Sequence, residues 1–431
     1  MWLSEGGRQF NYTEHNAPDI AAYSAHIEAI SARRIILDDG LRASNVTMIR
    51  YLNAGAADDY SIRLGDQISG VTGLLRYSRG SGSRGTESYR LMPTIDPLFE
   101  SVNPRPLVPL VNGEIRVTSF NLNNFFSTTD DGRRICGPAA DANCRGADSP
   151  TELQRQLSRI TAALRMIDAD IVGLVEIENN ASASLQALVD SLNTVMGAGT
   201  YAYVDTGTIG GDAIKVGLLY KPSAVQLRGA HAILDSSVDA RFVDHRSRPV
   251  LAQTFEQISN GALLTVAVNH LKSKGSSCAS DGDPNLGDGQ SNCSATRTAA
   301  ATAMVDWLAA DPTSSDDTDF LVIGDPNAHT LDDAISTFRN AGYLDLAQEY
   351  LGLDSYSFEF DGQSGALDHA LASGNLAPQV KGVLEWHINA DEPRVLNYDL
   401  ESDRDPNLFD GSLPYRASDH DPLIIGLDLT N

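Results

Sequence analysis

Several polar side chains of the kinds that bind metal ions or transfer protons lie at the ends of short apolar runs or within them. They are Asn121, Glu176, Asn269, His270, Asp325, Asn327, Asp368, His369, Asp419 and His420. Carboxylate and amide oxygens are the ligands that Mg²⁺, Mn²⁺ and Ca²⁺ prefer. Histidine exchanges protons near neutral pH, and a neighbouring carboxylate supports that role. Together these residue types suit hydrolysis assisted by a divalent cation, and no set of thiolates and imidazoles favours zinc.

Each of these positions also has an ordinary structural interpretation. An asparagine after a strand is most often a turn residue, and the segment 324–327 on its own indicates only a turn. A lone histidine on a strand is usually structural, and we place His369 and His387 in that class. The functional interpretation depends on the order in which many such positions follow one another along one chain.

The apolar runs that carry these side chains are predicted strands, separated by amphipathic helices. The strands are expected at 115–120, 171–175, 214–220, 263–269, 320–324, 367–371 and 423–427. A capping box with proline at its first helical position, Ser149 to Glu152, opens one helix, and others are expected through 185–195 and around 298–308. This alternation predicts an α/β fold, in which polar groups at strand ends meet at one edge of a sheet.

A separate β-rich domain is predicted before this α/β part. Residues 34–38 and 61–77 are rich in β-forming residues and are interrupted by glycine. The proline-rich segment 103–112 reads as a linker. The predicted organisation is therefore a small domain over 1–102, a linker over 103–112 and a catalytic domain over 113–431.

Charge is distributed unevenly along the chain, whose formal net charge is −25. This balance excludes a general basic nucleic-acid-coating protein. The excess acid lies almost entirely beyond residue 110, and every basic residue before it is arginine, the side chain best suited to bidentate phosphate contacts. A solvated acidic surface with ordinary arginines is one interpretation, and arginine contacts with nucleic acid are the other. No apolar run reaches the roughly 18 residues of a membrane helix.

The four cysteines form two close pairs, Cys136 with Cys144 and Cys278 with Cys293, in polar loops. Neither pair has the spacing of a zinc or redox motif. Three connectivities are possible, and we expect the two local ones, which would indicate an oxidising compartment. The alternative is four free thiols in a cytosolic protein. Because the first residues lack the features of a secretory signal, we expect a mature or truncated secreted protein.

The order of these positions resembles that of the endonuclease/exonuclease/phosphatase superfamily, which includes pancreatic-type deoxyribonucleases and abasic-site endonucleases. Longer runs are similar to bacterial extracellular nucleases of this superfamily. These runs are SFNLNNFF (119–126), DADIVGLVEIENN (168–180), GDAIKVGLLYKP (211–222), VNHLKSKGSSC (268–278), DGQSGALDHALAS (361–373), WHINADEP (386–393) and YRASDHDP (415–422). The first domain resembles the oligonucleotide-binding-fold (OB-like) domain of such nucleases. The resemblance begins some way into that domain, so we expect truncation at its N-terminus.

The resemblance implies a four-layer α/β/β/α sandwich, preceded by the small OB-like domain, with the site at one edge of the paired sheets. It implies Glu176 as the main metal ligand, with Asn121 and Asp419 completing or supporting the metal site. The implied ion is Mg²⁺, with Mn²⁺ or Ca²⁺ as alternatives.

The resemblance also assigns catalytic roles. His270 and His420 would flank the scissile phosphate, and Asp368 would orient His420. Asp325 and Asn327 would position and activate the attacking water and hold phosphate oxygens.

Three further positions concern the substrate and one departure from the family pattern. Asp212 and Lys215 match a family run close to the substrate. Relatives usually place a larger apolar residue where this chain has Pro326. Proline fixes φ and removes a backbone N–H, so Pro326 either displaces its neighbours and lowers activity or only stiffens the turn.

The sequence therefore predicts a secreted, divalent-metal-dependent nuclease that acts mainly as an endonuclease on DNA, with RNA as a further candidate substrate. An extracellular or periplasmic location follows from the expected disulfides, and neither a membrane segment nor a protein partner is implied. Two alternatives stay open. One is a phosphodiesterase of the same superfamily acting on lipids or phosphoinositides, and the other is a catalytically weakened nucleic-acid-binding protein.

Overall fold

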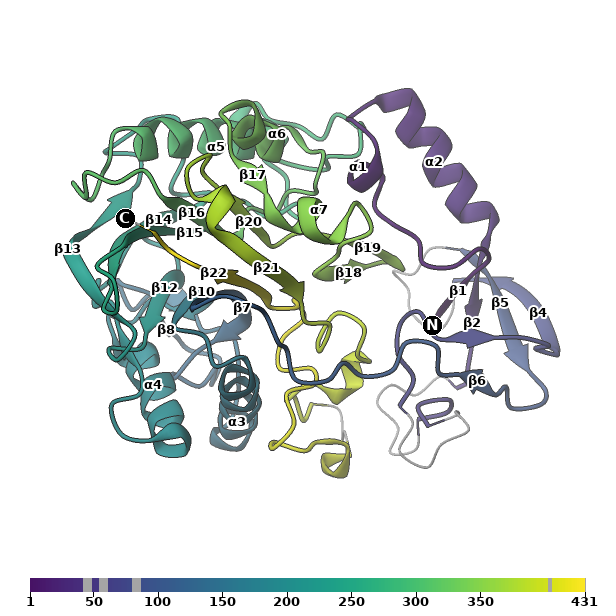
Figure 1. Ribbon diagram of the computed structural model, residues 1–431. Coiled ribbons are helices and arrows are strands. Elements are labelled where there is room, and N and C mark those ends of the chain that lie inside the picture. The colour runs from purple at the N-terminus through teal and green to yellow at the C-terminus, as the bar shows by residue number, and fades with distance from the viewer. Residues whose placement is uncertain (42–48, 54–60, 80–86, 402–404, 431) are drawn as a thin grey trace.

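Two six-stranded sheets packed face to face occupy the centre of the chain from residue 115 onward (Figure 1). The computed structural model describes residues 1–41, 49–53, 61–79, 87–401 and 405–430. The first sheet has the order β11-β12-β10-β7-β22-β21 and the second the order β13-β14-β15-β16-β20-β17. The first contains β7 (Ile115–Phe125), β10 (Ile171–Glu178), β11 (Ala202–Tyr203), β12 (Ile214–Tyr220), β21 (Val380–Glu385) and β22 (Leu423–Leu427). The second contains β13 (Val225–Leu234), β14 (Arg248–Gln257), β15 (Leu263–His270), β16 (Phe320–Asp325), β17 (Leu344–Asp345) and β20 (His369–Ala372).

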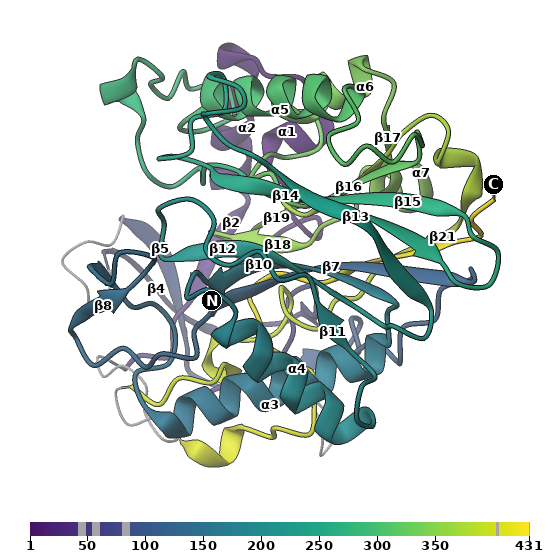
Figure 2. The same cartoon turned by 90° about the vertical axis from the view of Figure 1, so that its left-hand side faces the viewer.

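Helices cover the outer face of each sheet, which gives the predicted α/β/β/α order of layers (Figure 2). Helices α3 (Pro150–Ile167) and α4 (Ala183–Met196) pack on the first sheet. Helices α5 (Ser294–Ala309) and α6 (Asp333–Asn340) pack on the second. The remaining short elements are α7 (Leu346–Leu351), β8 (Arg134–Cys136), β9 (Ala142–Asn143), β18 (Phe358–Phe360), β19 (Gln363–Gly365) and 3₁₀ turns at Ala279–Asp281, Ala377–Gln379, Arg394–Leu396 and Pro406–Leu408.

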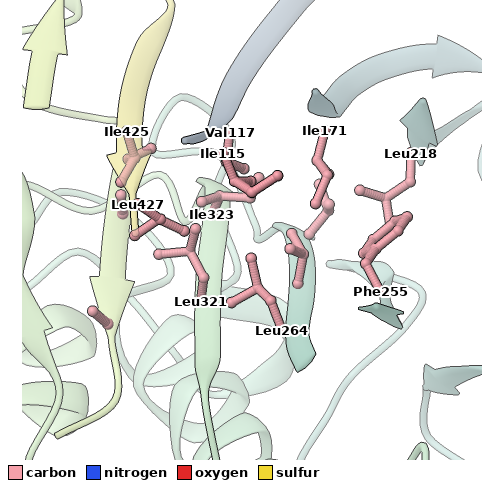
Figure 3. Close-up of a cluster of buried hydrophobic side chains, with 14 of the residues drawn as sticks. Ile115, Val117, Ile171, Leu218, Phe255, Leu264, Leu321, Ile323, Ile425 and Leu427 are labelled. Carbon is pink, nitrogen blue, oxygen red and sulfur yellow. The ribbon is translucent and has the colours of Figure 1, made fainter. Parts of the chain in front are cut away.

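The main hydrophobic core lies between the two sheets (Figure 3). Alternate residues of β7 and β22, including Val117 and Ile425, face Leu321 and Ile323 of β16. Gly173 of β10 sits where the sheets approach closely, because a Cβ there would lie 2.5 Å from Cδ1 of Ile323. Burial on both sides explains why these strands read as nearly continuous apolar runs.

Helix α3 begins and ends as its sequence predicts. The Ser149 hydroxyl accepts the N–H of Glu152 at 3.3 Å, and Pro150 occupies the first helical position. The Glu152 carboxylate accepts the N–H of Asp148, so the reciprocal bond of the capping box is displaced by one residue. Asp168 adopts the left-handed conformation, with φ 51°, at the C-cap. This helix carries the apolar face that covers the first sheet.

The N-terminal region contains the predicted strands and also two helices that the sequence did not predict. Its sheet has the order β1-β2-β5-β4, with β2 and β5 parallel, and a second pair joins β3 to β6. The bounds are β1 (Trp2–Ser4), β2 (Arg34–Leu37), β3 (Gln67–Ile68), β4 (Gly73–Ser78), β5 (Ser88–Pro93) and β6 (Phe99–Glu100), with α1 (Tyr12–His15) and α2 (Ile20–Ala32). Asp19 caps α2 by accepting the N–H of Ala22 at 2.7 Å. Parts of the expected OB-like domain, residues 42–48, 54–60 and 80–86, lie outside the described residues, and its five-stranded barrel stays a prediction.

Three arginines from the N-terminal region bind two buried acids of the catalytic part. Arg8 Nη1 lies 2.9 Å from Asp391 Oδ1, and Arg105 Nη2 lies 2.8 Å from Glu392 Oε2. Arg63 also pairs with Glu392. Neither acid has an exposed side chain, so each depends on these cations for its charge balance. At these positions arginine joins the two parts of the chain, and contact of the other arginines with nucleic acid stays one of two interpretations.

Both local disulfides are present, Cys136–Cys144 and Cys278–Cys293, and no cysteine is free. The first closes the loop that carries β8 and β9, and the second closes the loop before α5. The expected pairing is therefore confirmed. Among the residues described, no helix combines the length and apolar character needed to cross a bilayer.

Candidate active site

A cavity of about 460 Å³ opens where the two sheets present the ends of β10, β15 and β16. Six of the predicted site residues line it: Glu176, His270, Asp325, Asn327, Asp419 and His420. A larger hollow of about 700 Å³ lies over the N-terminal sheet and contains none of these residues. The chemistry of the lining therefore identifies the smaller cavity as the candidate active site.

Glu176 reaches the cavity from a bulge in β10. The register of β10 against β7 shifts between Val175 and Ile177, and Glu176 has a φ of 62°. Its Oε2 accepts two hydrogen bonds from Asn124, one from the backbone N–H at 2.9 Å and one from Nδ2 at 2.8 Å. Burial, followed by the charge of Asp419, raises the pKa of Glu176 above its usual value.

Asp325 and Asn327 occupy a tight turn at the end of β16. The N–H of Asn327 donates to Asp325 Oδ1 at 2.8 Å, and Asn327 Nδ2 donates to the carbonyl of Leu271 at 3.3 Å. This turn requires glycine at position 324, where φ is 126° and a Cβ would lie 2.1 Å from the carbonyl oxygen of Asn269. Both side chains line the cavity with Pro326 between them, and the effect of Pro326 on activity stays a prediction.

The pKa of Asp325 is raised to about 7, mainly by burial, with the Asp368 charge adding to the effect and the His420 charge opposing it. Asn121 Nδ2 donates to Asp325 Oδ2 at 3.3 Å. The oxygen of the same Asn121 side chain accepts the N–H of Asn123 at 3.0 Å. In this orientation Asn121 holds Asp325, and its predicted part in the metal site stays a prediction.

His420 and Asp368 form a buried pair on the other wall. Asp368 Oδ2 lies 2.7 Å from His420 Nδ1 and accepts a hydrogen bond from the Ser357 hydroxyl at 2.7 Å. The Phe358 ring packs against the imidazole with 4.6 Å between centroids. Burial disfavours the charged ring, but the Asp368 carboxylate outweighs it and raises the pKa of His420 well above its usual value. The predicted orienting role of Asp368 has the geometry that it requires.

His270 lies between the two halves of the cavity at the end of β15, which runs parallel to β16 with His270 beside Asp325. Its Nε2 is 3.8 Å from Glu176 Oε1 and 3.8 Å from Asp325 Oδ2. Burial, followed by the charge of Arg248, lowers the pKa of His270 well below its usual value. The ring is therefore neutral at neutral pH, and Arg248 Nη1 lies 3.4 Å from Nε2.

Two arginines at the cavity, Arg145 and Arg248, share one acid. Asp212 accepts from Arg145 Nη2 at 2.9 Å and from Arg248 Nε at 3.1 Å. Asp212 thus positions cations that line the cavity. Lys215 is different, because its buried ammonium group donates to the carbonyl groups of Ala181 and Gly207 and does not line the cavity. The structure gives Lys215 a role in holding a loop in place of the predicted substrate contact.

Sequence reasoning missed several cavity residues, among them four with polar side chains that bear on the arguments below. They are Asn124, Arg145, Arg248 and His329. Asn124 lies inside the quoted run 119–126 and could have been found there. Arg248 pairs with His270 across β14 and β15, and nothing in the sequence reveals that register. Arg145 is placed by the residue before it, Cys144, which belongs to a disulfide.

The donor set of the cavity fits a divalent cation. Glu176 and Asp419 are two carboxylates that line one cavity, and the Asp419 charge adds to burial in raising the pKa of Glu176. Oxygen donors of this kind suit Mg²⁺, Mn²⁺ or Ca²⁺. Elsewhere in the described residues, the side-chain oxygens of Asp148, Glu152 and Glu401 lie within 4.8 Å of one another. Backbone N–H groups of Asp148 and Leu400 already bind the Glu152 oxygens at the start of α3.

Two other histidines make structural contacts outside the reaction centre. His369 Nδ1 lies 3.2 Å from Asp345 Oδ2, and its Nε2 lies 2.9 Å from the carbonyl oxygen of Ala328. His387 stacks on Tyr356 with 4.0 Å between ring centroids and pairs through Nδ1 with Asp421 at 3.0 Å. These contacts agree with the structural roles expected for both.

Residues 118–420 match the family model described as the Endonuclease/Exonuclease/phosphatase family, and the chain belongs to that family. The match covers most of the two-sheet sandwich, ending before β22, and every cavity residue of the catalytic part that acts in the argument above. No curated protein matches the chain.

Three solved structures illustrate what this chain is similar to. An endonuclease/exonuclease/phosphatase family protein from Bacteroides thetaiotaomicron is 16% identical, with a TM-score of 0.45 over 72% of this chain and 96% of that chain. The catalytic domain of human Nocturnin with bound sulfate is 16% identical, with a TM-score of 0.45 over 74% and 97%. TDP2 from D. rerio in complex with a single-strand DNA product is 15% identical, with a TM-score of 0.44 over 72% and 97%.

Proposed function

We propose that the chain is a secreted, divalent-metal-dependent nuclease that hydrolyses phosphodiester bonds of DNA, with RNA as a second substrate, mainly by internal cleavage. One observation carries the proposal. Two carboxylates, Glu176 and Asp419, meet a charged histidine, His420, at a cavity lined by two arginines, Arg145 and Arg248. A phosphodiester is an anion that repels a water nucleophile, and this set provides both cation-binding and anion-binding groups for it.

Glu176 and Asp419 are the residues that would hold the cation. When bound there, Mg²⁺, or Mn²⁺ or Ca²⁺ in its place, supplies positive charge that stabilises the negative charge developing on the phosphoryl oxygens. Asn124 fixes Glu176 through two hydrogen bonds to Oε2 and leaves Oε1 turned toward His270. The left-handed backbone at Glu176 aims this carboxylate out of its strand.

Proton transfer falls to Asp325 and His420. Asp325 accepts the proton of the attacking water, and a pKa of about 7 suits a general base at neutral pH. Asn121 and the backbone of Asn327 hold its two oxygens. His420, kept cationic by Asp368, donates to the phosphoryl group and gives its proton to the departing oxygen as the P–O bond breaks.

The remaining residues position the phosphate. His270 is neutral, so it does not repel Arg248, whose Nη1 lies 3.4 Å from the ring nitrogen Nε2. Arg145 and Arg248 are held beside the cavity by Asp212. Guanidinium groups bind phosphate oxygens in pairs. They give an acidic protein a local surface that attracts a polyanion.

Nucleic acid as the substrate rests on the similarity of the runs 119–126, 268–278 and 415–422 to those of extracellular nucleases. The two disulfides support an oxidising compartment, as expected for export. Residues Phe358, Phe360 and Leu367 give one wall of the cavity an apolar character. This wall is the observation that favours the second candidate, a phosphodiesterase acting on lipid substrates.

The test is incubation with closed circular plasmid, linear DNA and RNA, each with Mg²⁺, Mn²⁺, Ca²⁺ or a chelator. We expect the closed circle to be nicked with a divalent cation and to stay intact with chelator, because only an endonuclease acts on DNA without ends. A short-chain phospholipid assayed in parallel distinguishes the second candidate. Hydrolysis of the lipid with intact nucleic acids would replace the proposed function, and cleavage of linear DNA alone would replace endonuclease by exonuclease action.

A further inference from the structure

A second carboxylate–histidine pair lies at the cavity, and one of its members comes from the N-terminal region. His329, two residues beyond Asn327, lines the cavity and is 5% exposed. Its Nδ1 lies 2.8 Å from Glu14 Oε1. Glu14 belongs to α1, more than three hundred residues earlier in the chain. None of the catalytic roles assigned above uses this pair.

The pair is fixed by the surrounding backbone. Glu14 Oε1 also accepts the N–H of Ala366 at 2.7 Å, and the neighbouring Thr13 carbonyl accepts the N–H of Leu331 at 2.7 Å. The N–H of His329 donates to Asp332 Oδ2 at 3.1 Å. Contacts on both sides therefore set the position of the imidazole ring and the direction of its second nitrogen.

The geometry leaves one nitrogen of the ring for the cavity. Nδ1 faces Glu14 and the carbonyl oxygen of Ala366, while Nε2 has no hydrogen-bond partner within the described parts of the chain. The other Glu14 oxygen, Oε2, is buried without a partner. Since Nδ1 lies beside two acceptors, Glu14 Oε1 and the Ala366 carbonyl, Nε2 is the nitrogen left to meet a ligand in the cavity.

The wall around His329 is suited to an anion. Lys274 and Ser273 also line the cavity, together with Asn11 of the N-terminal segment, and Asp332 contacts both Lys274 and the N–H of His329. The Lys274 ammonium group is held by Asp332 and the carbonyl of Gln290. Arg145 and Arg248 line the cavity as well, beside Asp212, and a nucleic acid chain presents a regular row of phosphates to both groups of donors.

We propose that His329, positioned by Glu14, binds the phosphodiester group next to the scissile one, so that the N-terminal segment completes the substrate site of the catalytic part. This inference rests on the proposed nuclease function and specifies how that site recognises a polymer. It gives the enzyme a preference for substrates that carry at least two phosphates in a row. Glu14 acts through His329 as a positioning residue.

The test compares a polymer with a substrate that has one phosphate. Steady-state kinetics are measured on a defined oligonucleotide and on bis(4-nitrophenyl) phosphate for the full chain and for His329→Gln and Glu14→Gln. Binding of a fluorescently labelled oligonucleotide is measured by anisotropy in chelator, where cleavage does not occur. His15→Gln is the matched control, because His15 adjoins Glu14 but contacts the carbonyl of Leu353 and the carboxylate of Asp354 away from the cavity.

We expect both variants to raise KM for the oligonucleotide and to weaken its binding by about tenfold or more, the loss typical of one hydrogen bond between charged partners. The increase in KM for the oligonucleotide should be at least about tenfold larger than any increase in KM for bis(4-nitrophenyl) phosphate. The variant carrying both substitutions should bind no more weakly than His329→Gln alone, because the two residues act as one unit. The control should behave as the unmodified protein on both substrates.

Two results would overturn the inference. One is an equal loss on both substrates, which would place His329 at the scissile phosphate or give the pair a purely structural role. The other is unchanged oligonucleotide binding in both variants. Thermal unfolding of each variant distinguishes a folding defect from a loss of substrate binding. Glu14→Gln tests the inference independently, because the imidazole of His329 is still present in that variant. If the unmodified chain neither binds nor cleaves the oligonucleotide, the proposed nuclease function itself fails, which is a different outcome.

Discussion

Replacing Asp368 with asparagine tests whether Asp368 and His420 act as one unit. Asp368 Oδ2 lies 2.7 Å from both His420 Nδ1 and the Ser357 hydroxyl, and the residue is buried. Asparagine preserves the shape and an acceptor for Ser357. It removes the negative charge that overcomes burial and keeps the pKa of His420 high. The variant should therefore lose protonated His420 at a lower pH than the unmodified protein does.

The size of the effect follows from the strength of the bond that is lost. A hydrogen bond between charged partners contributes about 1.5–3 kcal/mol, and about 1.4 kcal/mol of barrier changes a rate tenfold. We therefore expect kcat to fall by about 10- to 150-fold in Asp368→Asn. Removing the ring in His420→Ala also removes proton donation, for which a loss of about 10²- to 10⁴-fold is typical.

The assay is the initial rate of plasmid nicking at fixed free Mg²⁺, measured from about pH 5 to about pH 10, the range that spans both catalytic groups. The acid limb reports Asp325, which must lose its proton to act as a base. The alkaline limb reports His420 and should move to lower pH in Asp368→Asn. The double variant Asp368→Asn/His420→Ala should be no slower than His420→Ala. Additive losses, or an alkaline limb that stays in place, would refute the reasoning.

Three further predictions concern the cation, a structural ion pair and a disulfide. Glu176→Gln should nearly abolish cleavage, with partial recovery at high Mg²⁺ or Mn²⁺ and an unchanged circular dichroism spectrum; full activity at low metal would contradict its assignment as a ligand. His369→Gln should lower the free energy of unfolding by about 3 kcal/mol, because it leaves Asp345 buried and unpaired. Burial disfavours the charged form of His369, but Asp345 outweighs burial and raises the pKa of His369 to about 9. The loss of unfolding free energy should therefore be complete below about pH 6.5 and should shrink as the pH rises through 9. Denaturant titrations at several pH values measure this dependence. The Cys278–Cys293 bridge closes a separation of 15 residues, and its removal should destabilise the fold by about 3 kcal/mol. Removal of the shorter bridge should cost less, and differential scanning calorimetry of the two Cys→Ser double variants measures both effects.

Most strands that bury a continuous apolar face could be predicted from the sequence. Strands β12 and β22 have the expected bounds, and α3 begins at the expected cap. Strand β14 is buried along most of its length but was missed, because polar residues between Gln253 and Gln257 interrupt its apolar run. Strand β13 was missed because much of it is exposed, so its sequence lacks the apolar run that marks a buried strand. Helix α2 was missed because it lies in a region expected to be β-rich, and its apolar face is weak; only the capping Asp19 marks its start.

The site could be predicted only in part, because sequence order does not give cross-strand register or long-range pairing. Residues at strand ends, such as Glu176 and Asp325, were found because strand ends gather at one sheet edge. Arg248 reaches the cavity only through its register with His270. Glu14 reaches it because α1 packs against residues 364–366, a contact that joins opposite ends of the chain.

The backbone at Glu176 shows that this fold gives up stability to maintain its site. A glutamate with a φ of 62° has about 1–2 kcal/mol of steric strain that glycine would not have. The carboxylate is also taken out of water beside Asp419. Glutamine at this position would keep an acceptor for Asn124 and remove the buried charge, so Glu176→Gln should melt at a higher temperature than the unmodified protein while cleaving almost nothing. Selection of this protein for heat resistance alone would therefore favour substitutions of Glu176 that abolish catalysis. A screen for thermostable variants needs an activity assay at every round.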